Sequence, residues 1–217
     1  DVYKRQSFKE NDKQLIEWYK KEIARNGIEV RFNTEINDLG ILRGYDEIIV
    51  ATGAVPRKML IPGFEKCLTF TQLLREKYPV GDKVVFFGGG QSACEAAYEM
   101  VLQGKHPIIV EYAKDLVPAQ NVCLSNASFL RDVLEYHKVP TYLEHTIREI
   151  KDKTVVIASK DGKNVFEVEY DNIVNGIGFV PAPVGGKGKN IHRVGDCVTI
   201  GNLRTAIWRA WDVCMKI

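Results

Sequence analysis

Three small residues at fixed spacing follow a short apolar run and could hold a phosphate group. Gly88, Gly90 and Ala93 form a GxGxxA pattern directly after the apolar residues 84–87. In such a pattern the first glycine makes a tight turn, the second lets the backbone approach a diphosphate, and the third small residue lets a helix pack on a strand. The N–H groups that open the helix attract the diphosphate. The predicted contacts are Gly88, Gly89, Gly90, Gln91 and Ser92.

An acidic side chain, Glu111, ends a second apolar run about 20 residues beyond Gly90. At this place a carboxylate can accept a hydrogen bond from a ribose 2′-hydroxyl, and it would repel a 2′-phosphate. The pair of features therefore predicts NAD rather than NADP. A glycine-rich turn that binds no ligand remains the alternative.

The remaining residue types indicate neither a metal site nor a catalytic side chain. The four histidines are scattered singly, without the spacing of metal ligands. The five cysteines are odd in number and never form CxxC, which favours a reducing compartment, the cytoplasm. We expect Cys94 and Cys197 to be buried packing residues, and Glu95 to be a solvated helix residue.

Composition excludes several classes of protein. The chain has 217 residues, 45% of them hydrophobic, and 30 Lys and Arg against 28 Asp and Glu. This is a globular composition with room for one large or two small domains. Acids and bases are interspersed without a basic stripe, so a nucleic-acid partner is not expected. The apolar runs are too short to span a membrane.

The predicted elements around the glycine pattern form a βαβ unit: a strand over 83–87, a helix over 92–103 and a strand over 107–111. A second helix and a strand-like run follow, and then three short strands that form a β-meander. The expected ranges are 125–138, 139–143, 146–151, 154–160 and 164–170.

The flanking segments predict further elements. Apolar spacing predicts a helix over 9–26, and the alternation of Ile28, Val30 and Phe32 predicts a strand. Residues 45–53 and 170–178 resemble each other: each begins with polar residues, continues as a short apolar strand and ends at a glycine. The further ranges are 181–190 for a loop, 191–195 for a last strand and 203–217 for a final helix.

The first six residues, 1–6, resemble the in-frame translation of a transposase adapter used in sequencing libraries. As a tag, they would take no part in the fold. The remaining chain is then expected to be a fragment, a C-terminal piece of a longer protein.

Three segments together resemble the flavoproteins with two dinucleotide-binding domains. They are residues 51–57 (ATGAVPR), the Gly88 pattern, and Val194-Gly195-Asp196 before the final helix. The resemblance is to the C-terminal FAD/NAD(P)-binding region of the NADH:flavin oxidoreductases with an old-yellow-enzyme barrel. These are enzymes of the 2,4-dienoyl-CoA reductase, 2-enoate reductase and bile-acid-inducible enone reductase type. The likeness extends from about Ser7 to Ile217.

The resemblance implies an α/β fold in which a Rossmann-like NADH-binding domain, residues 80–168, is inserted into an FAD-binding domain, residues 7–79 and 169–217. The FAD domain would be incomplete, because the family's first strand and its glycine pattern should precede Ser7. The family's barrel, which carries FMN, and its cysteines for a 4Fe-4S cluster are also absent from this chain.

The resemblance also implies cofactor contacts outside the glycine turn. Thr52 and Gly53 would line the adenine and diphosphate side of FAD, Asp196 would bind its ribityl chain, and the final helix would point at the flavin. Simpler roles remain open: strand-end packing for Thr52 and capping for Asp196. The implied contacts are Thr52, Gly53, Gly178, Gly195, Asp196 and Arg204.

The implied function is electron input. NADH would pass a hydride to FAD, and electrons would continue through an iron-sulfur centre and FMN to an activated C=C bond of an enoyl-CoA or enone. The implied partners are the nicotinamide nucleotide, the missing barrel domain and, in a homo-oligomer, a second copy; the fragment alone is expected to be inactive. Two alternatives remain: a non-catalytic ADP-binding module, and a small flavoprotein that donates electrons to a separate protein.

Overall fold

The computed structural model describes residues 6–118 and 122–217. Residues 1–5 of the expected adapter tag lie outside the described residues. The chain forms two compact units: the first is Asp1–Asn26 with Lys58–Gly178, and the second is Gly27–Arg57 with Phe179–Ile217. These boundaries reflect internal contacts, whereas the expected domain limits concern cofactors, so the latter stay predictions. The α/β class predicted from the sequence is confirmed.

The first unit is built on a four-stranded parallel sheet in the order β5-β4-β3-β9. The chain runs outward from β3 through β4 to β5 and later returns to the other side of β3 as β9, so the strand order reverses between β3 and β9. In open parallel sheets ligands bind at this reversal, beyond the carboxyl ends of the strands. The bounds are Lys83–Phe87 for β3, His106–Glu111 for β4, Thr141–Leu143 for β5 and Asn172–Asn175 for β9.

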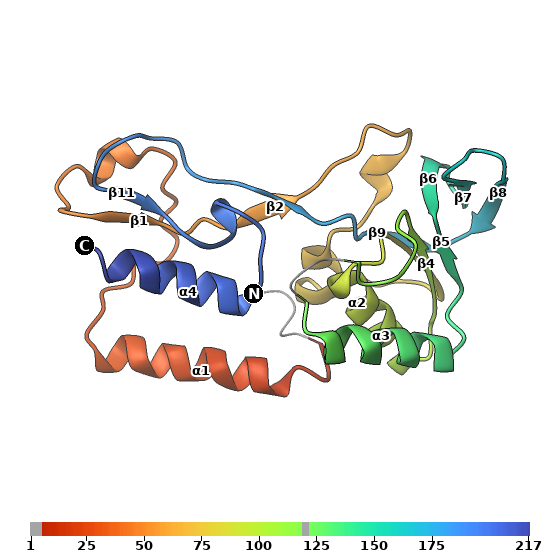
Figure 1. Ribbon diagram of the computed structural model, residues 1–217, viewed down its shortest axis with the longest axis horizontal. Helices are drawn as coiled ribbons and strands as arrows, with labels where there is room; N and C mark the ends of the chain where they lie inside the picture. Colours follow the sequence, from red (N-terminus) through yellow and green to blue (C-terminus); the bar gives the residue numbers. More distant parts are fainter. Residues whose placement is uncertain (1–5, 119–121) are drawn as a thin grey trace. The chain divides into compact units, whose positions relative to one another are not determined.

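Both faces of this sheet are covered (Figure 1). Helix α2, Gln91–Leu102, packs on β3 and β4, and α3, Leu124–Tyr136, packs against α2. Val85 and Phe87 of β3 belong to the core with the meander β6-β7-β8, so the sheet lies between helices and meander. The meander strands are antiparallel, as predicted, and span His145–Ile150, Thr154–Ser159 and Val165–Glu169.

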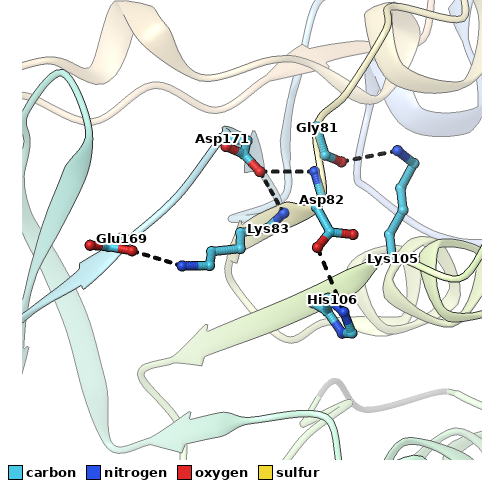
Figure 2. A network of polar contacts seen from close by, with 7 residues as sticks. All are labelled: Gly81, Asp82, Lys83, Lys105, His106, Glu169 and Asp171. Atoms are coloured by element: carbon cyan, nitrogen blue, oxygen red, sulfur yellow. Dashed lines mark hydrogen bonds and ion pairs between the residues drawn. The ribbon is translucent and has the colours of Figure 1, made fainter.

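A polar network joins the starts of β3, β4 and β9, at the sheet edge opposite the glycine turn (Figure 2). The Asp171 carboxylate accepts hydrogen bonds from the backbone N–H groups of Asp82 and Lys83, both at 2.8 Å. Lys83 Nζ pairs with Glu169 at 2.7 Å, and Lys105 Nζ donates to Gly81 O at 3.0 Å. These contacts hold the strand starts in register.

We expect Asp171→Asn to lower stability at pH 7 and to flatten the acid dependence of unfolding. Backbone hydrogen bonds from Lys83 and Asp82 hold the pKa of Asp171 below its ordinary 3.8. A carboxyl with a lowered folded-state pKa stabilises the fold above its unfolded pKa, and this contribution is lost as the pH falls through the folded value. Urea unfolding at pH 7 and near pH 3 measures both effects. The same change at exposed Asp132 is the control, and equal behaviour of the two variants would contradict the assignment.

The second unit contains two short sheets. Strand β1, Ile48–Val50, pairs in parallel with β11, Ile191–Arg193, and β2, Ala54–Pro56, pairs antiparallel with β10, Phe179–Pro181. Its core consists of Leu39, Ile48, Val50 and Cys197. The unit ends in helix α4, Leu203–Cys214. The short helical turns of the chain are η2 Leu39–Leu42, η3 Phe64–Lys66, η4 Thr71–Arg75 and η5 Gly195–Cys197.

One predicted strand is wrong. Residues 28–31 have no regular structure, and Ile28, Val30 and Phe32 are 58%, 45% and 81% exposed. Alternating apolar residues form a strand only where a neighbouring strand takes up their backbone hydrogen bonds, and none of the described residues pairs with this segment. Strands β2 and β10 were not predicted, because each has only three residues and no alternating pattern.

The two outer helices occur where their periodicity predicts them. Helix α1 spans Glu10–Arg25, and α4 begins at Leu203 as expected. Neither helix, both described in full, has a buried side chain, so the apolar residues Leu203, Ile207 and Trp211 remain exposed. Periodicity therefore predicted the helices but not what their apolar faces contact.

Candidate functional site

The glycine turn lies at the carboxyl end of β3, at the reversal of strand order. Gly88 adopts a φ of 108°, a region that L side chains rarely occupy, and its N–H donates to Val110 O at 2.8 Å. A Cβ built on Gly88 would lie 2.5 Å from Gly176 O, at the end of the adjacent strand β9. The first glycine is therefore required by the fold itself.

Gly90 has a different environment from Gly88. Apart from Gly90 and its chain neighbours Gly89 and Gln91, no described residue has an atom within 4 Å of a Cβ built on Gly90, which precedes α2 with φ −68° and ψ 172°. Such open space next to backbone is what a diphosphate needs in order to approach closely. Ala93 fills the third position of the pattern: its Cβ is 3.0 Å from a Cβ built on Gly176. A larger residue there would push helix and sheet apart.

The first turn of α2 can bind an anion. Within the described chain, no side chain caps its N-terminus at Gly90, and the first intrahelical bond runs from Cys94 N–H to Gly90 O. The N–H groups before Cys94, those of Gln91, Ser92 and Ala93, open the helix and carry the positive end of its dipole. Gln91 Nε2 donates to Glu95 Oε1 at 3.0 Å, and Ser92 is half-buried. The turn thus offers backbone donors at one open place.

Glu111 lies beside the turn, as the sequence indicated, and its carboxylate is already held by the backbone. Oε2 accepts the Gly89 N–H at 2.5 Å, and Oε1 accepts the Ala113 N–H at 2.7 Å. A carboxylate has about four acceptor positions, so two remain for a ribose hydroxyl. The sequence did not predict that Glu111 also fixes the turn.

A second glycine-containing segment follows β9 at the same sheet edge. Gly176 N–H donates to Phe87 O at 2.8 Å, and Asn175 Oδ1 accepts the Ile177 N–H at 3.3 Å. Gly178, a predicted cofactor contact, has a φ of 95° and no atom of the described chain near its Cβ position. The two glycine segments, one after each strand, meet at the reversal of strand order.

Two carboxylates of α2 are buried, which the sequence analysis missed. Glu95, expected to be solvated, is 7% exposed and pairs with Lys9 Nζ at 2.8 Å. Glu99 is 8% exposed and accepts from both the N–H and the hydroxyl of Ser7, at 3.0 and 2.8 Å. The sequence of α2 carried no signal for this burial, because the partners that a buried acid needs lie far away in the sequence.

The remaining candidate residues lie in the second unit, at the carboxyl edge of the β1–β11 sheet. Thr52 Oγ1 donates to Ala182 O at 2.8 Å, and Asp196 Oδ1 accepts the Gly201 N–H at 3.0 Å. Gly53 and Gly195 have positive φ values of 74° and 68°, with open space at their Cβ positions. The parallel pairing of β1 and β11 thus brings Thr52 and Gly53, which follow β1, close to Gly195 and Asp196, which follow β11. Arg204 lies apart from them, in α4.

Side chains of the loop before α4 accept hydrogen bonds from backbone N–H groups of the loop and of the helix. Asn202 caps the helix by accepting the Thr205 N–H at 3.0 Å, and Asp196 binds the same loop through Gly201. Arg204, in the first turn of α4, is exposed. These contacts are compatible with the capping role left open for Asp196, and its role toward a flavin stays a prediction.

The buried thiols fit packing roles. Cys94 and Cys197 are 0% and 2% exposed, and the five cysteines are free. Burial raises the pKa of Cys94 to about 12, and its Sγ donates to Gly89 O at 3.3 Å. Within residues 6–118 and 122–217 there is no cluster of three or more potential metal ligands, and no helix is both long and apolar enough to cross a bilayer.

The chain is similar to reductases that are about three times longer. Cinnamate reductase of Clostridium sporogenes is 29% identical over 217 residues, which cover 97% of this chain and 32% of that protein. Nitrite reductase of Bacillus subtilis is 26% identical over 181 residues, 76% of this chain and 22% of that protein. The chain therefore spans about a third or less of the length of these curated relatives.

Solved structures show the same arrangement of elements. A 2-naphthoyl-CoA reductase in complex with 2-naphthoyl-CoA matches with a TM-score of 0.87 and 26% identity, over 100% of this chain and 34% of that one. Thioredoxin reductase of T. acidophilum shares the fold, with a TM-score of 0.61 and 16% identity over 78% of this chain and 64% of its own. A sequence profile described as pyridine nucleotide-disulphide oxidoreductase matches residues 42–214. The chain therefore belongs to the pyridine nucleotide-disulphide oxidoreductase family.

Proposed function

We propose that the first unit binds NADH at the glycine turn and that the chain is the NADH-oxidising module of a flavoprotein. The observation that carries the proposal is the open space at Gly90, in front of the uncapped N-terminus of α2 and at the reversal of strand order. Backbone N–H groups and the helix dipole suit a diphosphate there. When bound, the nicotinamide supplies a hydride and the flavin accepts it.

Each residue of the turn has a proposed task. Gly88 makes the turn. Gly89 lies along the diphosphate without donating to it, because Glu111 already binds its N–H. Gly90, Gln91 and Ser92 hold the diphosphate through backbone or side-chain donors. Glu111 accepts a hydrogen bond from the adenosine ribose with the acceptor positions that Gly89 and Ala113 leave free. The negative charge of Glu111 also repels the 2′-phosphate of NADPH, so this side chain favours NADH.

The second unit is proposed to contribute to an FAD site. Its candidate residues share one sheet edge, and two of its glycines combine positive φ with open space, as close approach to a cofactor requires. Asp196 uses one oxygen for Gly201 and retains acceptor capacity for a ribityl hydroxyl. The proposed contacts of the second unit are Thr52, Gly53, Gly195 and Asp196 at this sheet edge and Arg204 in α4. Gly178 of the first unit stays a separately proposed cofactor contact.

The wider activity is proposed from the relatives. One relative is named as a reductase of cinnamate and another as a reductase of 2-naphthoyl-CoA, and both extend well beyond the part that this chain matches. We propose that electrons pass onward, through an iron-sulfur centre and FMN outside this chain, to an activated C=C bond of an enoyl-CoA or enone. The alternative is a module that binds ADP structurally and transfers no hydride, because the turn and Glu111 would bind ADP equally well.

Calorimetric titration of the full chain with NADH, NADPH, ADP and FAD tests the proposal. We expect NADH to bind at least about tenfold more tightly than NADPH, a difference of about 1.4 kcal/mol. Absence of binding by all four nucleotides would contradict it. Equal affinity for NADH and NADPH would contradict the role of Glu111. Loss of visible flavin absorbance when NADH is added to the full-length flavoprotein would distinguish hydride transfer from structural ADP binding, because the FAD site of this chain alone is expected to be incomplete.

A further inference from the structure

The segment Asp115–Val117, which follows β4, packs against the glycine turn at Gly89. Val117 N–H donates to Gly89 O at 2.8 Å, and a Cβ built on Gly89 would lie 2.6 Å from Leu116 Cδ2. Leu116 and Val117 are both buried. Gly89 is therefore held at both polar groups: its N–H by Glu111 and its carbonyl by Val117.

Val117 adopts a conformation that this residue type disfavours. Its φ is 49°, in the left-handed region, where a β-branched residue is a genuine outlier. Such a backbone persists only when the surrounding structure holds it. The peptide group between Leu116 and Val117 is held from outside the segment on its N–H side by Gly89 O.

Arg131 of α3 holds the carbonyl side of the same peptide group. Its Nε and Nη2 both donate to Leu116 O, at 3.0 and 2.8 Å, and Nη2 also pairs with Asp115 Oδ2 at 3.1 Å. The planar guanidinium suits this fork of contacts, which a lysine ammonium can reproduce only in part. Arg131 thus fixes the carbonyl directly before Val117, and with it the N–H that binds Gly89.

We propose that Arg131 is a positioning residue for the nucleotide: it holds Asp115–Val117 against the back of the glycine turn, so that the turn is ordered before the diphosphate arrives. The inference rests on the proposed function, because it assigns the diphosphate to this turn. A preformed turn binds more tightly because the ligand does not have to order it. Arg131 acts through Leu116, Val117 and Gly89 and needs no contact of its own with the nucleotide.

The experiment compares Arg131→Met with Arg131→Lys and with Arg148→Met, the same change at an exposed arginine of β6. Amide hydrogen exchange at Gly89 and Val117 is measured on the ligand-free full chain. The affinities for NADH, NADPH and ADP are measured by calorimetry, well below the unfolding temperature, with folding checked by circular dichroism. If Arg131→Met does not fold, Arg131→Lys carries the same comparison.

We expect Arg131→Met to speed exchange at Gly89 and Val117 several-fold and to weaken NADH, NADPH and ADP by the same factor, about tenfold, the range of a lost hydrogen bond to a charged group. Arg131→Lys should recover part of the loss, and Arg148→Met should change neither measurement. If the affinities for NADH, NADPH and ADP fall by the same factor, the change acts on the diphosphate site that all three share. An effect on the ribose site would change the ratio of the NADH and NADPH affinities.

Unchanged exchange at Gly89 in Arg131→Met would overturn the inference, and so would faster exchange with unchanged affinity for NADH. A loss of equal size in Arg148→Met would also overturn it. If the unmodified chain binds no nucleotide, the proposed function has failed separately. Exchange at Gly89 still decides in that case whether Arg131 holds the turn.

Discussion

Replacing Gly88 with alanine is expected to destabilise the fold strongly, whereas the same replacement at Gly90 should leave stability unchanged and abolish tight nucleotide binding. At Gly88 the new Cβ would meet a backbone oxygen at 2.5 Å, and the φ of 108° is unsuited to alanine. We expect a loss of about 4 kcal/mol and a fall in Tm of about 10 °C.

At Gly90 the backbone, with φ −68° and ψ 172°, already suits alanine, and no described atom lies near the new methyl group. A slightly poorer N-cap and a less flexible unfolded chain have opposite effects of below about 1 kcal/mol each. The methyl group would instead occupy the space proposed for the diphosphate. The affinity for NADH should fall at least about tenfold.

Thermal unfolding and NADH calorimetry on the two variants separate the two roles. The variants are controls for each other, because both add one methyl group to the same turn. A Gly90→Ala chain that binds NADH as tightly as the unmodified protein would remove the diphosphate from this turn. A Gly88→Ala chain of unchanged Tm would contradict the close approach to Gly176.

Glu111→Gln is expected to change nucleotide preference rather than nucleotide binding as a whole. Glutamine keeps the shape and one acceptor but loses the charge that disfavours a 2′-phosphate. The ratio of NADH to NADPH affinity should therefore fall about tenfold. Because the amide NH2 would face one of the two backbone N–H groups now bound by Glu111, stability should also fall by about 1–2 kcal/mol.

Glu111→Arg is a poorer test, although it reverses the charge. It would leave the N–H groups of Gly89 and Ala113 without their acceptor, which disturbs the turn for every nucleotide. Equal loss of NADH and NADPH in that variant would therefore report on the turn. Glu135→Gln, at an exposed position of α3, is the matched control. An unchanged preference in Glu111→Gln would exclude the ribose role.

The prediction of the central unit from the sequence succeeded because its signals are local. The apolar run 83–87, the glycine turn and the apolar face of the next helix each specify their own conformation through turn sterics and periodicity. Glu111 could be placed beside the turn because adjacent parallel strands end at the same edge of a sheet. The last two strands of the meander are joined at Asp161-Gly162, a turn signal present in the sequence.

The strand expected at Ile28, Val30 and Phe32 failed for the opposite reason. Alternation shows that a segment could be a strand, but pairing depends on another segment. The burial of Glu95 and Glu99 likewise depends on Lys9 and Ser7, about 90 positions away. No periodicity within α2 distinguishes a buried acid with a partner from a solvated one.

By itself, the sequence determined the βαβ unit, the glycine turn, the acidic residue beside it and the family, because bonded neighbours and regular periods encode each of them. Only the tertiary structure decided how the turn is held. Glu111 binds it from the next strand, Val117 binds it in an unfavourable conformation, and Arg131 restrains Val117 from a separate helix. These contacts join residues distant in sequence, and their geometry exists only once sheet and helices have packed.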